Sequence, residues 1–255
     1  MPHRALLVAL LVLAGAARGA PDCAAPTRQA LRIELPAPGP QAAEVALALP
    51  SSCTERAPLL IVSTTSDAGY QSSRALMAVY QPAALAAGWA LLAVDPDPPV
   101  PSAHDTLALR WQLLQAALAA ARQRQAQLGR AGLALAGFSG GAKYASWLAA
   151  LLVREGEPVT GLFLSGVNED QVSPAARSLE VLDGRYRQLP IVLQSGRADA
   201  VATPRQHRAV EAALREQGFR QLRLRTVDGG HAPSIDALPE ALAWFAERMT
   251  DTRRR

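Results

Sequence analysis

The sequence lacks the features that mark membrane, repeat and nucleic-acid-binding proteins. Among its 255 residues, 49% are hydrophobic and 19% are charged, with no internal repeat and no long low-complexity linker. One large core in one domain is therefore the expectation. Beyond the first 20 residues, no apolar run approaches the length that spans a bilayer. Basic residues are interleaved with acids and alanines, apart from an arginine tail at residues 253–255. We therefore expect no nucleic-acid partner and no stable membrane insertion; the oligomeric state is left open.

The sequence also lacks the usual motifs for cofactors. It has no G-x-G-x-x-G dinucleotide fingerprint and no lysine at the fixed position of a phosphate-binding P-loop. Only two cysteines are present, which is too few for a structural zinc site built on thiolates. We therefore expect neither a metal nor an organic cofactor.

The N-terminus has the pattern of a secretory signal. Residues 1–20 hold a short basic start, an apolar stretch at residues 5–14 and then small residues. We expect a signal peptide over residues 1–20, a mature domain over residues 21–255, and export to a periplasm or out of the cell. Ala14-Gly15-Ala16 fits the cleavage pattern better than Arg18-Gly19-Ala20 does, so the cut is left open. Loss of the two arginines in this segment leaves 24 basic and 22 acidic residues, a formal charge of +2 in place of +4.

Both cysteines, Cys23 and Cys53, follow the expected cut. In an oxidising compartment an even pair most simply forms one disulfide. We predict a Cys23–Cys53 bond that ties the new N-terminus to the exit of the second strand.

Strand patterns and helix patterns alternate along the rest of the chain. Residues 30–35 and 44–49 alternate apolar with polar side chains, which predicts an antiparallel pair at a sheet edge. Later apolar runs are short and nearly continuous, as in strands with both faces covered, and they fall at residues 59–62, 90–94, 133–136, 159–164, 191–194 and 222–227. Helical segments separate them, at residues 73–87, 105–128, 142–154, 204–217 and 235–249. We predict an α/β protein with a mostly parallel central sheet, helices on both faces and its working crevice at the carboxyl ends of the strands.

The most informative segment is Gly137-Phe138-Ser139-Gly140-Gly141. It follows an apolar run and opens an amphipathic one, so it predicts a strand, a tight turn and a helix. The glycines allow a strained reversal that lifts the Ser139 hydroxyl clear of the sheet and leaves the Gly140 amide at a helix N-terminus. A phosphate loop or a capping serine is the alternative, but Lys143 falls too late for a P-loop. We interpret Ser139 as a nucleophile.

A serine nucleophile needs an imidazole to take its proton and a carboxylate to orient that imidazole. We choose His231, which follows the last predicted strand in a glycine-rich loop. His3 lies in the signal, His207 lies inside a predicted helix, and His104 precedes the long crossover helix, where capping or exposure is the simpler role.

For the carboxylate we favour Asp199, which follows the strand at residues 191–194. Asp170, after the preceding strand, is the alternative acid. Asp199 has an alternative role too, as a loop acid paired with Arg197. Asp228 lies too close to His231 along the chain to back it.

The order of Ser139, Asp199 and His231 resembles that of the α/β-hydrolases, over residues 30–249. The resemblance implies a serine hydrolase that cleaves carboxylic esters, of small molecules or of polymers, through an acyl-enzyme. The layout is similar to secreted esterases and to polyester-depolymerase-like or feruloyl-esterase-like members. Two other functions stay open: a peptidase that uses the same groups, and an exported binding protein that kept the fold without the activity.

The sequence departs from that family in two places. Many relatives carry His-Gly after the strand that precedes the first helix, where this chain has Ser63-Thr64-Thr65-Ser66-Asp67. We expect the amide of Thr65 or Ser66, aided by a hydroxyl, to complete an oxyanion hole with Gly140. Relatives that bind long acyl chains often insert a helical lid between the strands at residues 159–164 and 191–194, whereas this connection is modest. We therefore expect an open cleft and short acyl or accessible ester substrates.

Overall fold

A computed structural model describes residues 25–35, 42–51, 56–67, 69, 72–94 and 101–253. The predicted signal peptide over residues 1–20 and both cysteines, Cys23 and Cys53, lie outside the described residues. Eight strands form a single sheet in the described part of the chain: β1 (Thr27–Glu34), β2 (Ala42–Leu49), β3 (Leu59–Ser63), β4 (Ala90–Ala93), β5 (Leu133–Phe138), β6 (Val159–Ser165), β7 (Ile191–Gly196) and β8 (Leu222–Val227).

The strands lie in the order β1-β2-β4-β3-β5-β6-β7-β8. β1 pairs with β2, and β2 with β4, in antiparallel fashion, whereas every pairing from β4 through β8 is parallel. This confirms the predicted α/β class and the antiparallel pair at one edge. From β3 the chain crosses to β4 on one side, and from β4 it returns past β3 to β5. The segments that follow β3 and β5 therefore lie side by side at the carboxyl edge, where crevices form in sheets of this kind.

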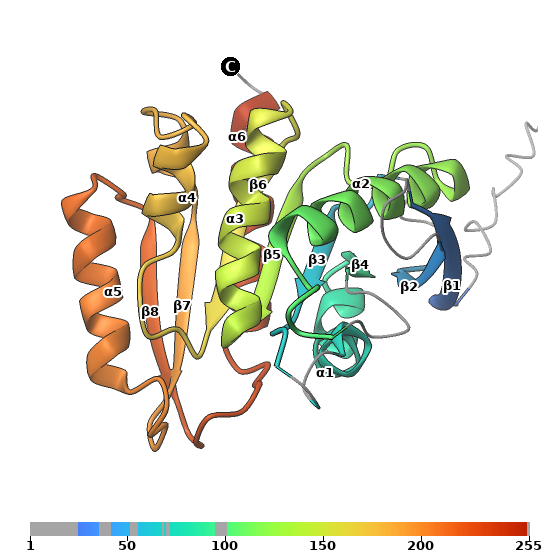
Figure 1. Ribbon diagram of the computed structural model, residues 1–255. Helices are drawn as coiled ribbons and strands as arrows, with labels where there is room; N and C mark the ends of the chain where they lie inside the picture. Colours follow the sequence, from blue (N-terminus) through green and yellow to red (C-terminus); the bar gives the residue numbers. More distant parts are fainter. Residues whose placement is uncertain are drawn as a thin grey trace, which may run out of the picture.

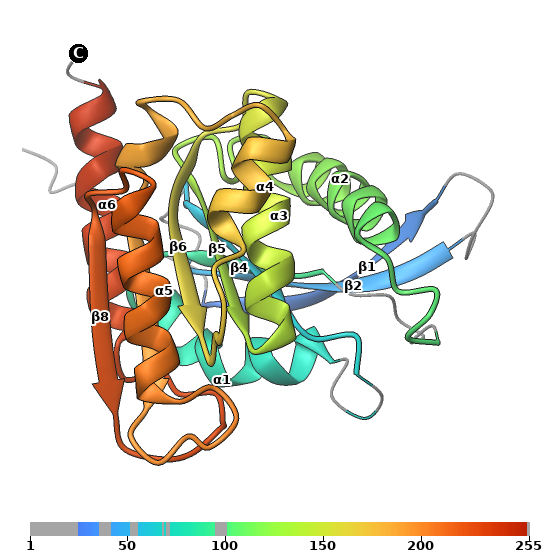
Figure 2. The same ribbon diagram turned by 60° about the vertical axis from the view of Figure 1, so that its left-hand side comes forward.

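Helices cover both faces of the sheet (Figures 1 and 2). One face carries α1 (Ser73–Ala86) and α6 (Leu238–Arg253), and the other carries α2 (Leu107–Arg124), α3 (Gly140–Arg154), α4 (Val172–Ser178) and α5 (Pro204–Glu216). Two buried apolar clusters correspond to these two layers. Because both faces of the central strands are covered, β3 and β4 are buried at every position, and β5 is buried at every position except Phe138. None of the described helices is both long and apolar enough to cross a membrane.

Local capping sets several helix starts. Thr106 accepts a hydrogen bond from the Leu109 amide at 3.2 Å, so α2 begins at Leu107 rather than at the predicted residue 105. Thr203 and Gln206 form a capping box in front of α5, where Pro204 occupies the first turn. α6 begins at Leu238, three residues later than predicted, because the preceding segment is held in turns by Gln194, whose Oε1 accepts from the Ala237 amide at 3.0 Å.

The connection between β6 and β7 holds more structure than the sequence predicts. It contains α4 and a short 3-10 turn, Tyr186–Gln188. α4 packs against α3, and its apolar side chains join the core on that face of the sheet. At seven residues it is too short to show a clear helical period in the sequence.

Candidate active site

Ser139 lies between β5 and α3 in a strained conformation, with φ 55° and ψ −124°. Few residues other than glycine adopt such values, and they recur where strain serves function. The flanking glycines are needed because the chain packs on itself. A Cβ on Gly137 would lie 2.3 Å from the carbonyl oxygen of Gly141, and a Cβ on Gly141 would lie 2.2 Å from that of Ser63. The sharp strand-to-helix turn therefore has the shape that the glycine spacing predicts.

Three side chains from three strand ends meet at this turn. The Nε2 atom of His231 lies 3.0 Å from Ser139 Oγ, and its Nδ1 atom lies 2.8 Å from Asp199 Oδ2. Ser139 follows β5, Asp199 follows β7 and His231 follows β8, so the parallel sheet brings them together at its carboxyl edge. With Nδ1 donating its proton to the carboxylate, Nε2 is left to accept the serine proton.

The Asp199 carboxyl is buried, yet it ionises more readily than an ordinary aspartic acid side chain. Its side chain is 1% exposed. Desolvation raises the pKa of this carboxyl, but the hydrogen bonds from His231 and from the amides of Ala202 and Val201 outweigh it, so the pKa is lowered overall. Oδ1 accepts those two amides at 2.7 and 2.8 Å, which leaves Oδ2 for the imidazole. The carboxylate is thus ionised and fixed in direction at neutral pH.

The imidazole of His231 is held by packing as well as by its hydrogen bonds. The Phe138 ring lies against it, with centroids 4.7 Å apart. On the same side a Cβ on Gly166 would approach His231 Cε1 to 3.1 Å and the Phe138 ring to 2.8 Å. Only glycine leaves room for both rings here, and Gly166 also has a positive φ of 63°. The side chain of His231 remains 22% exposed, so substrate can approach it.

The competing acids have other roles. The Oδ1 atom of Asp170 accepts from the amides of Val172 and Ser173 at 2.8 and 3.1 Å, at the start of α4. Arg197 pairs with Asp228 at 3.1 Å on the open surface, not with Asp199.

His104 is exposed, whereas His207 is fully buried behind the site. His207 Nε2 accepts from the Val167 amide at 3.1 Å, and Nδ1 lies 3.2 Å from the Thr203 carbonyl oxygen. Burial lowers the pKa of this imidazole, against smaller opposite effects of the Thr203 carbonyl and Asp199. His207 therefore stays neutral and joins the loop after β6 to the start of α5, a connection that its helical sequence context did not indicate.

The loop after β3 lies against the elbow, as its strand order requires. A Cβ on Gly140 would meet Thr65 Oγ1 at 2.5 Å and Thr65 Cβ at 2.9 Å. The Gly140 amide begins α3, where N–H groups have no acceptor within the helix, and no described hydrogen bond uses the Thr65 amide. The Thr65 hydroxyl donates to Asp67 Oδ2 at 2.8 Å, so its proton is engaged within the loop. Ser66 accepts from the Ser102 hydroxyl through its carbonyl oxygen at 2.5 Å.

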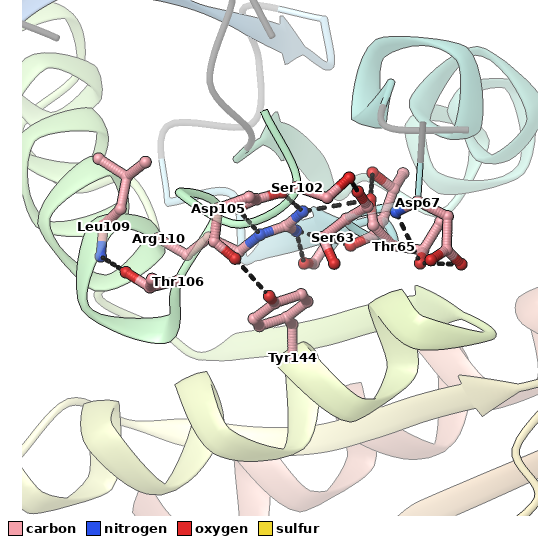
Figure 3. A network of polar contacts seen from close by, with 11 residues as sticks. Ser63, Thr65, Asp67, Ser102, Asp105, Thr106, Leu109, Arg110 and Tyr144 are labelled. Atoms are coloured by element: carbon pink, nitrogen blue, oxygen red, sulfur yellow. Dashed lines mark hydrogen bonds and ion pairs between the residues drawn. The ribbon is translucent and has the colours of Figure 1, made fainter. Parts of the chain in front are cut away.

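A buried polar cluster beside this loop was missed by the sequence analysis. It consists of Arg110, Asp105 and Tyr144, which surround the carbonyl groups of the loop after β3 (Figure 3). The available signal was a lone arginine in the apolar start of the predicted helix at residues 105–128. Among the described residues, no cluster of three or more histidine, cysteine or acidic side chains has the geometry for a metal.

Comparison with known proteins adds information on the fold. A scan against protein-family models found no match, and a search of curated proteins found no similar sequence. Solved structures do match. Carboxyl esterase 2 from the mycorrhizal fungus Tuber melanosporum is 14% identical, with a TM-score of 0.61 over 90% of this chain and 89% of that one. A fungal esterase from Rhizomucor miehei is 10% identical, with a TM-score of 0.61 over 90% and 85%.

A third match is the acylaminoacyl peptidase of Pyrococcus horikoshii. It is 11% identical, with a TM-score of 0.55 over 91% of this chain but only 41% of that one. At such identities the similarity concerns the fold alone. The mostly parallel eight-stranded sheet, its antiparallel edge pair, the helices on both faces and these structural neighbours together establish that the chain has the α/β-hydrolase fold.

Proposed function

We propose that this protein is a serine hydrolase that cleaves carboxylic esters through an acyl-enzyme, with Ser139 as nucleophile, His231 as base and Asp199 as the orienting acid. The observation that carries the proposal is the pair of distances at His231, 3.0 Å to Ser139 and 2.8 Å to Asp199. Both lie within the range required of a nucleophile and its base. The strained turn that presents Ser139 supports the same role.

In the acylation step, Ser139 Oγ forms a bond to the ester carbonyl carbon while its proton passes to His231 Nε2. The buried Asp199 carboxylate stabilises the imidazolium that results. Negative charge develops on the former carbonyl oxygen, and we assign its stabilisation to the amides of Gly140 and of Thr65 or Ser66. Collapse of this intermediate breaks the bond to the alcohol oxygen, which takes the proton from Nε2 and leaves.

Deacylation repeats the sequence with water. His231 Nε2 removes a proton from a water molecule as that water attacks the acyl-enzyme carbonyl. The second tetrahedral intermediate then expels Ser139 Oγ, which regains its proton. The products are a carboxylic acid and the free enzyme, and every proton passes through a single nitrogen atom.

Short acyl esters and accessible ester groups of polymers are the proposed substrate class. The connection between β6 and β7 supports this, since its only α-helix is the seven-residue α4, which packs against α3. A lid formed by this connection would cover His231. The side chain of His231 is instead 22% exposed, as an open cleft requires.

The test compares the wild-type protein with Ser139→Ala and with Ser146→Ala. Ser146 is a suitable control because it lies on α3, is buried, and bonds only to the Ala142 carbonyl of its own helix at 2.9 Å. We expect wild type and Ser146→Ala to hydrolyse a short aryl ester and to label with a fluorophosphonate. Ser139→Ala should not label, and its kcat should fall by a factor of about 10⁴ or more.

Each other outcome has a definite meaning. Equal turnover by Ser139→Ala would remove Ser139 from the mechanism. A higher kcat/KM for acyl amides than for matched esters would reassign the protein as a peptidase. A wild-type protein that binds esters without labelling or turnover would indicate a binding protein that retains the fold.

We also propose that the chain is exported after loss of residues 1–20, with a disulfide between Cys23 and Cys53. The short apolar stretch at residues 5–14 and the even number of cysteines support this. N-terminal sequencing of the protein recovered from a periplasmic extract and from culture medium is the direct test, since an intact Met1 in cells that export a control protein would contradict it.

A further inference from the structure

A fully buried arginine lies beside the loop that carries the assigned oxyanion donors. Arg110, on the first turn of α2, has 0% of its surface exposed. Its Nε and Nη2 atoms donate to the two oxygens of Asp105 at 2.7 and 2.6 Å, a bidentate ion pair. Both side chains are shielded from water, with 0% and 1% of the side-chain surface exposed. Removing a charged pair from water is costly, and further hydrogen bonds must compensate for the lost hydration. The other partners of Arg110 therefore indicate which part of the structure the ion pair holds in place.

The same guanidinium also binds the loop after β3, beside which it lies (Figure 3). Nη1 donates to the Thr64 carbonyl oxygen at 2.6 Å and to Ser63 Oγ at 3.0 Å, and Nη2 donates to the Thr65 carbonyl oxygen at 3.3 Å. Three positions that are 45 to 47 residues away along the chain are thus tied to one rigid, planar group.

Tyr144 closes the remaining side of the guanidinium. Its ring centroid lies 4.0 Å from Arg110 Cζ, and its hydroxyl donates to the Asp105 carbonyl oxygen at 2.7 Å. Tyr144 belongs to α3, the helix that begins at Gly140. The cluster therefore joins the loop after β3 to the helix that follows Ser139.

The geometry of the peptide bond links these contacts to the donors. In a planar trans peptide the C=O and N–H groups point in opposite directions. The Thr64 carbonyl shares a peptide plane with the Thr65 amide, and the Thr65 carbonyl shares one with the Ser66 amide. Arg110 therefore holds the two planes whose N–H groups are candidates for the oxyanion hole, and it holds them by their opposite ends.

We propose that Arg110 is a positioning residue that orients the Thr65 amide as the second oxyanion donor. In this role it takes the place of the His-Gly segment that the loop lacks. This inference rests on the proposed function. The Thr65 amide is favoured over that of Ser66 because its peptide carbonyl has the shorter bond to Arg110, 2.6 Å against 3.3 Å, and because Thr65 lies directly against Gly140. A donor fixed before reaction needs no reorganisation when charge develops, which is the condition for efficient stabilisation.

The test variant is Arg110→Lys, which keeps the charge but cannot bind Asp105 and two carbonyls with one planar group. Arg122→Lys is a matched control, because Arg122 lies on the same helix and also makes a bidentate pair, with Glu157 at 2.6 and 2.7 Å. Glu157 lies near the N-terminal end of β6, away from the site. Each protein is assayed for kcat and KM on a short aryl ester. The concentration of active sites in each preparation is measured by labelling to completion with a fluorophosphonate, and kcat is calculated per labelled site.

We expect Arg110→Lys to lower kcat by a factor of about 10 to 100 with KM changed less than threefold, since donor alignment affects the transition state rather than substrate binding. The inhibition constant of an alkyl boronic acid, which forms a tetrahedral adduct on the serine, should weaken by a similar factor. Arg122→Lys should match wild type in kcat, KM and boronate affinity.

A merely structural role predicts a different pattern. Arg110→Lys would then melt at a lower temperature but keep its kcat within twofold per labelled site, and that result would overturn the inference. If Arg110→Lys yields no folded protein, Tyr144→Phe decides, because it retains the ring and loses only the hydroxyl. Its kcat should fall threefold or more, and an unchanged kcat would equally overturn the inference. Failure of the proposed function is distinguishable, since it appears as an inactive wild type or an active Ser139→Ala.

Discussion

Substituting Gly141 by alanine should damage both stability and turnover, because its added methyl group has no space. The Cβ would lie 2.2 Å from the Ser63 carbonyl oxygen, 2.6 Å from Thr64 Cα and 2.8 Å from the Ser63 carbonyl carbon. All three are backbone atoms, so no side chain can rotate away. To restore even the 3.0 Å that real Cβ atoms rarely go below, α3 and the end of β3 must separate by at least 0.8 Å.

The size of the effect follows from that displacement. Overpacking of a rigid interior typically costs 1–3 kcal/mol, and a contact with backbone on every side belongs at the upper end, about 3 kcal/mol. For a domain of this size that corresponds to a fall in Tm of roughly 6–12 °C. The same movement shifts the loop that holds Thr65 away from Gly140. A misplacement of about 1 Å in an active site costs roughly 10²-fold in turnover, so kcat should fall by about that factor.

Calorimetry and ester kinetics on Gly141→Ala test this, with Gly184→Ala as the matched control. A Cβ on Gly184 would meet nothing within 4 Å, and this residue lies in an exposed turn. The control should therefore melt within about 1 °C of wild type. The reasoning would be refuted if Gly141→Ala also melted within about 2 °C of wild type and kept its kcat, since the approach of α3 to β3 would then not be as close as 2.2 Å implies.

Three further predictions concern charge and covalent structure. Asp199→Asn should lower kcat by a factor of about 10⁴ while the fold is retained, because the amide no longer orients and stabilises the imidazolium; circular dichroism and ester assays check this, and a loss below tenfold would contradict it. Burial lowers the pKa of His207 below its ordinary 6.5, so its contribution to stability is complete above about pH 6.5 and is lost as the pH falls through the folded-state pKa. Urea unfolding at pH 7.5 and pH 5.5 should therefore show a smaller pH dependence in His207→Gln than in wild type, and equal dependences would dissociate His207 from acid destabilisation. Mass spectrometry of the mature protein after alkylation without reductant should find Cys23 and Cys53 unmodified, and alkylation of both would exclude their bond.

The sequence was sufficient for the elements that depend on local patterns. Continuous apolar runs marked buried strands such as β3 and β4, because a strand covered on both faces cannot alternate with polar residues. The run at residues 222–227 was predicted in the same way, but β8 is half-exposed because it lies at the edge of the sheet. The antiparallel pair at the edge was predicted from alternation in residues 30–35 and 44–49, and the structure confirms it as β1 and β2. The glycine spacing around Ser139 was informative for the same reason, since the contact between Gly137 and Gly141 involves residues only four positions apart.

What the sequence left undecided depends on pairs of residues far apart along the chain. The choice between Asp199 and Asp170 is decided by the strand order, which puts β7 beside β8 and leaves Asp170 to cap α4. The contact of Arg110 with the Thr64 carbonyl spans 46 residues and exists because β3 lies between β4 and β5. Local hydrophobic periodicity does not encode strand order, since buried parallel strands such as β3, β4 and β5 present the same continuous apolar pattern. Local patterns therefore identify most of the strands and helices and the sharp turn at Ser139, whereas long-range packing selects the carboxylate that faces the imidazole and the arginine that holds the loop beside it.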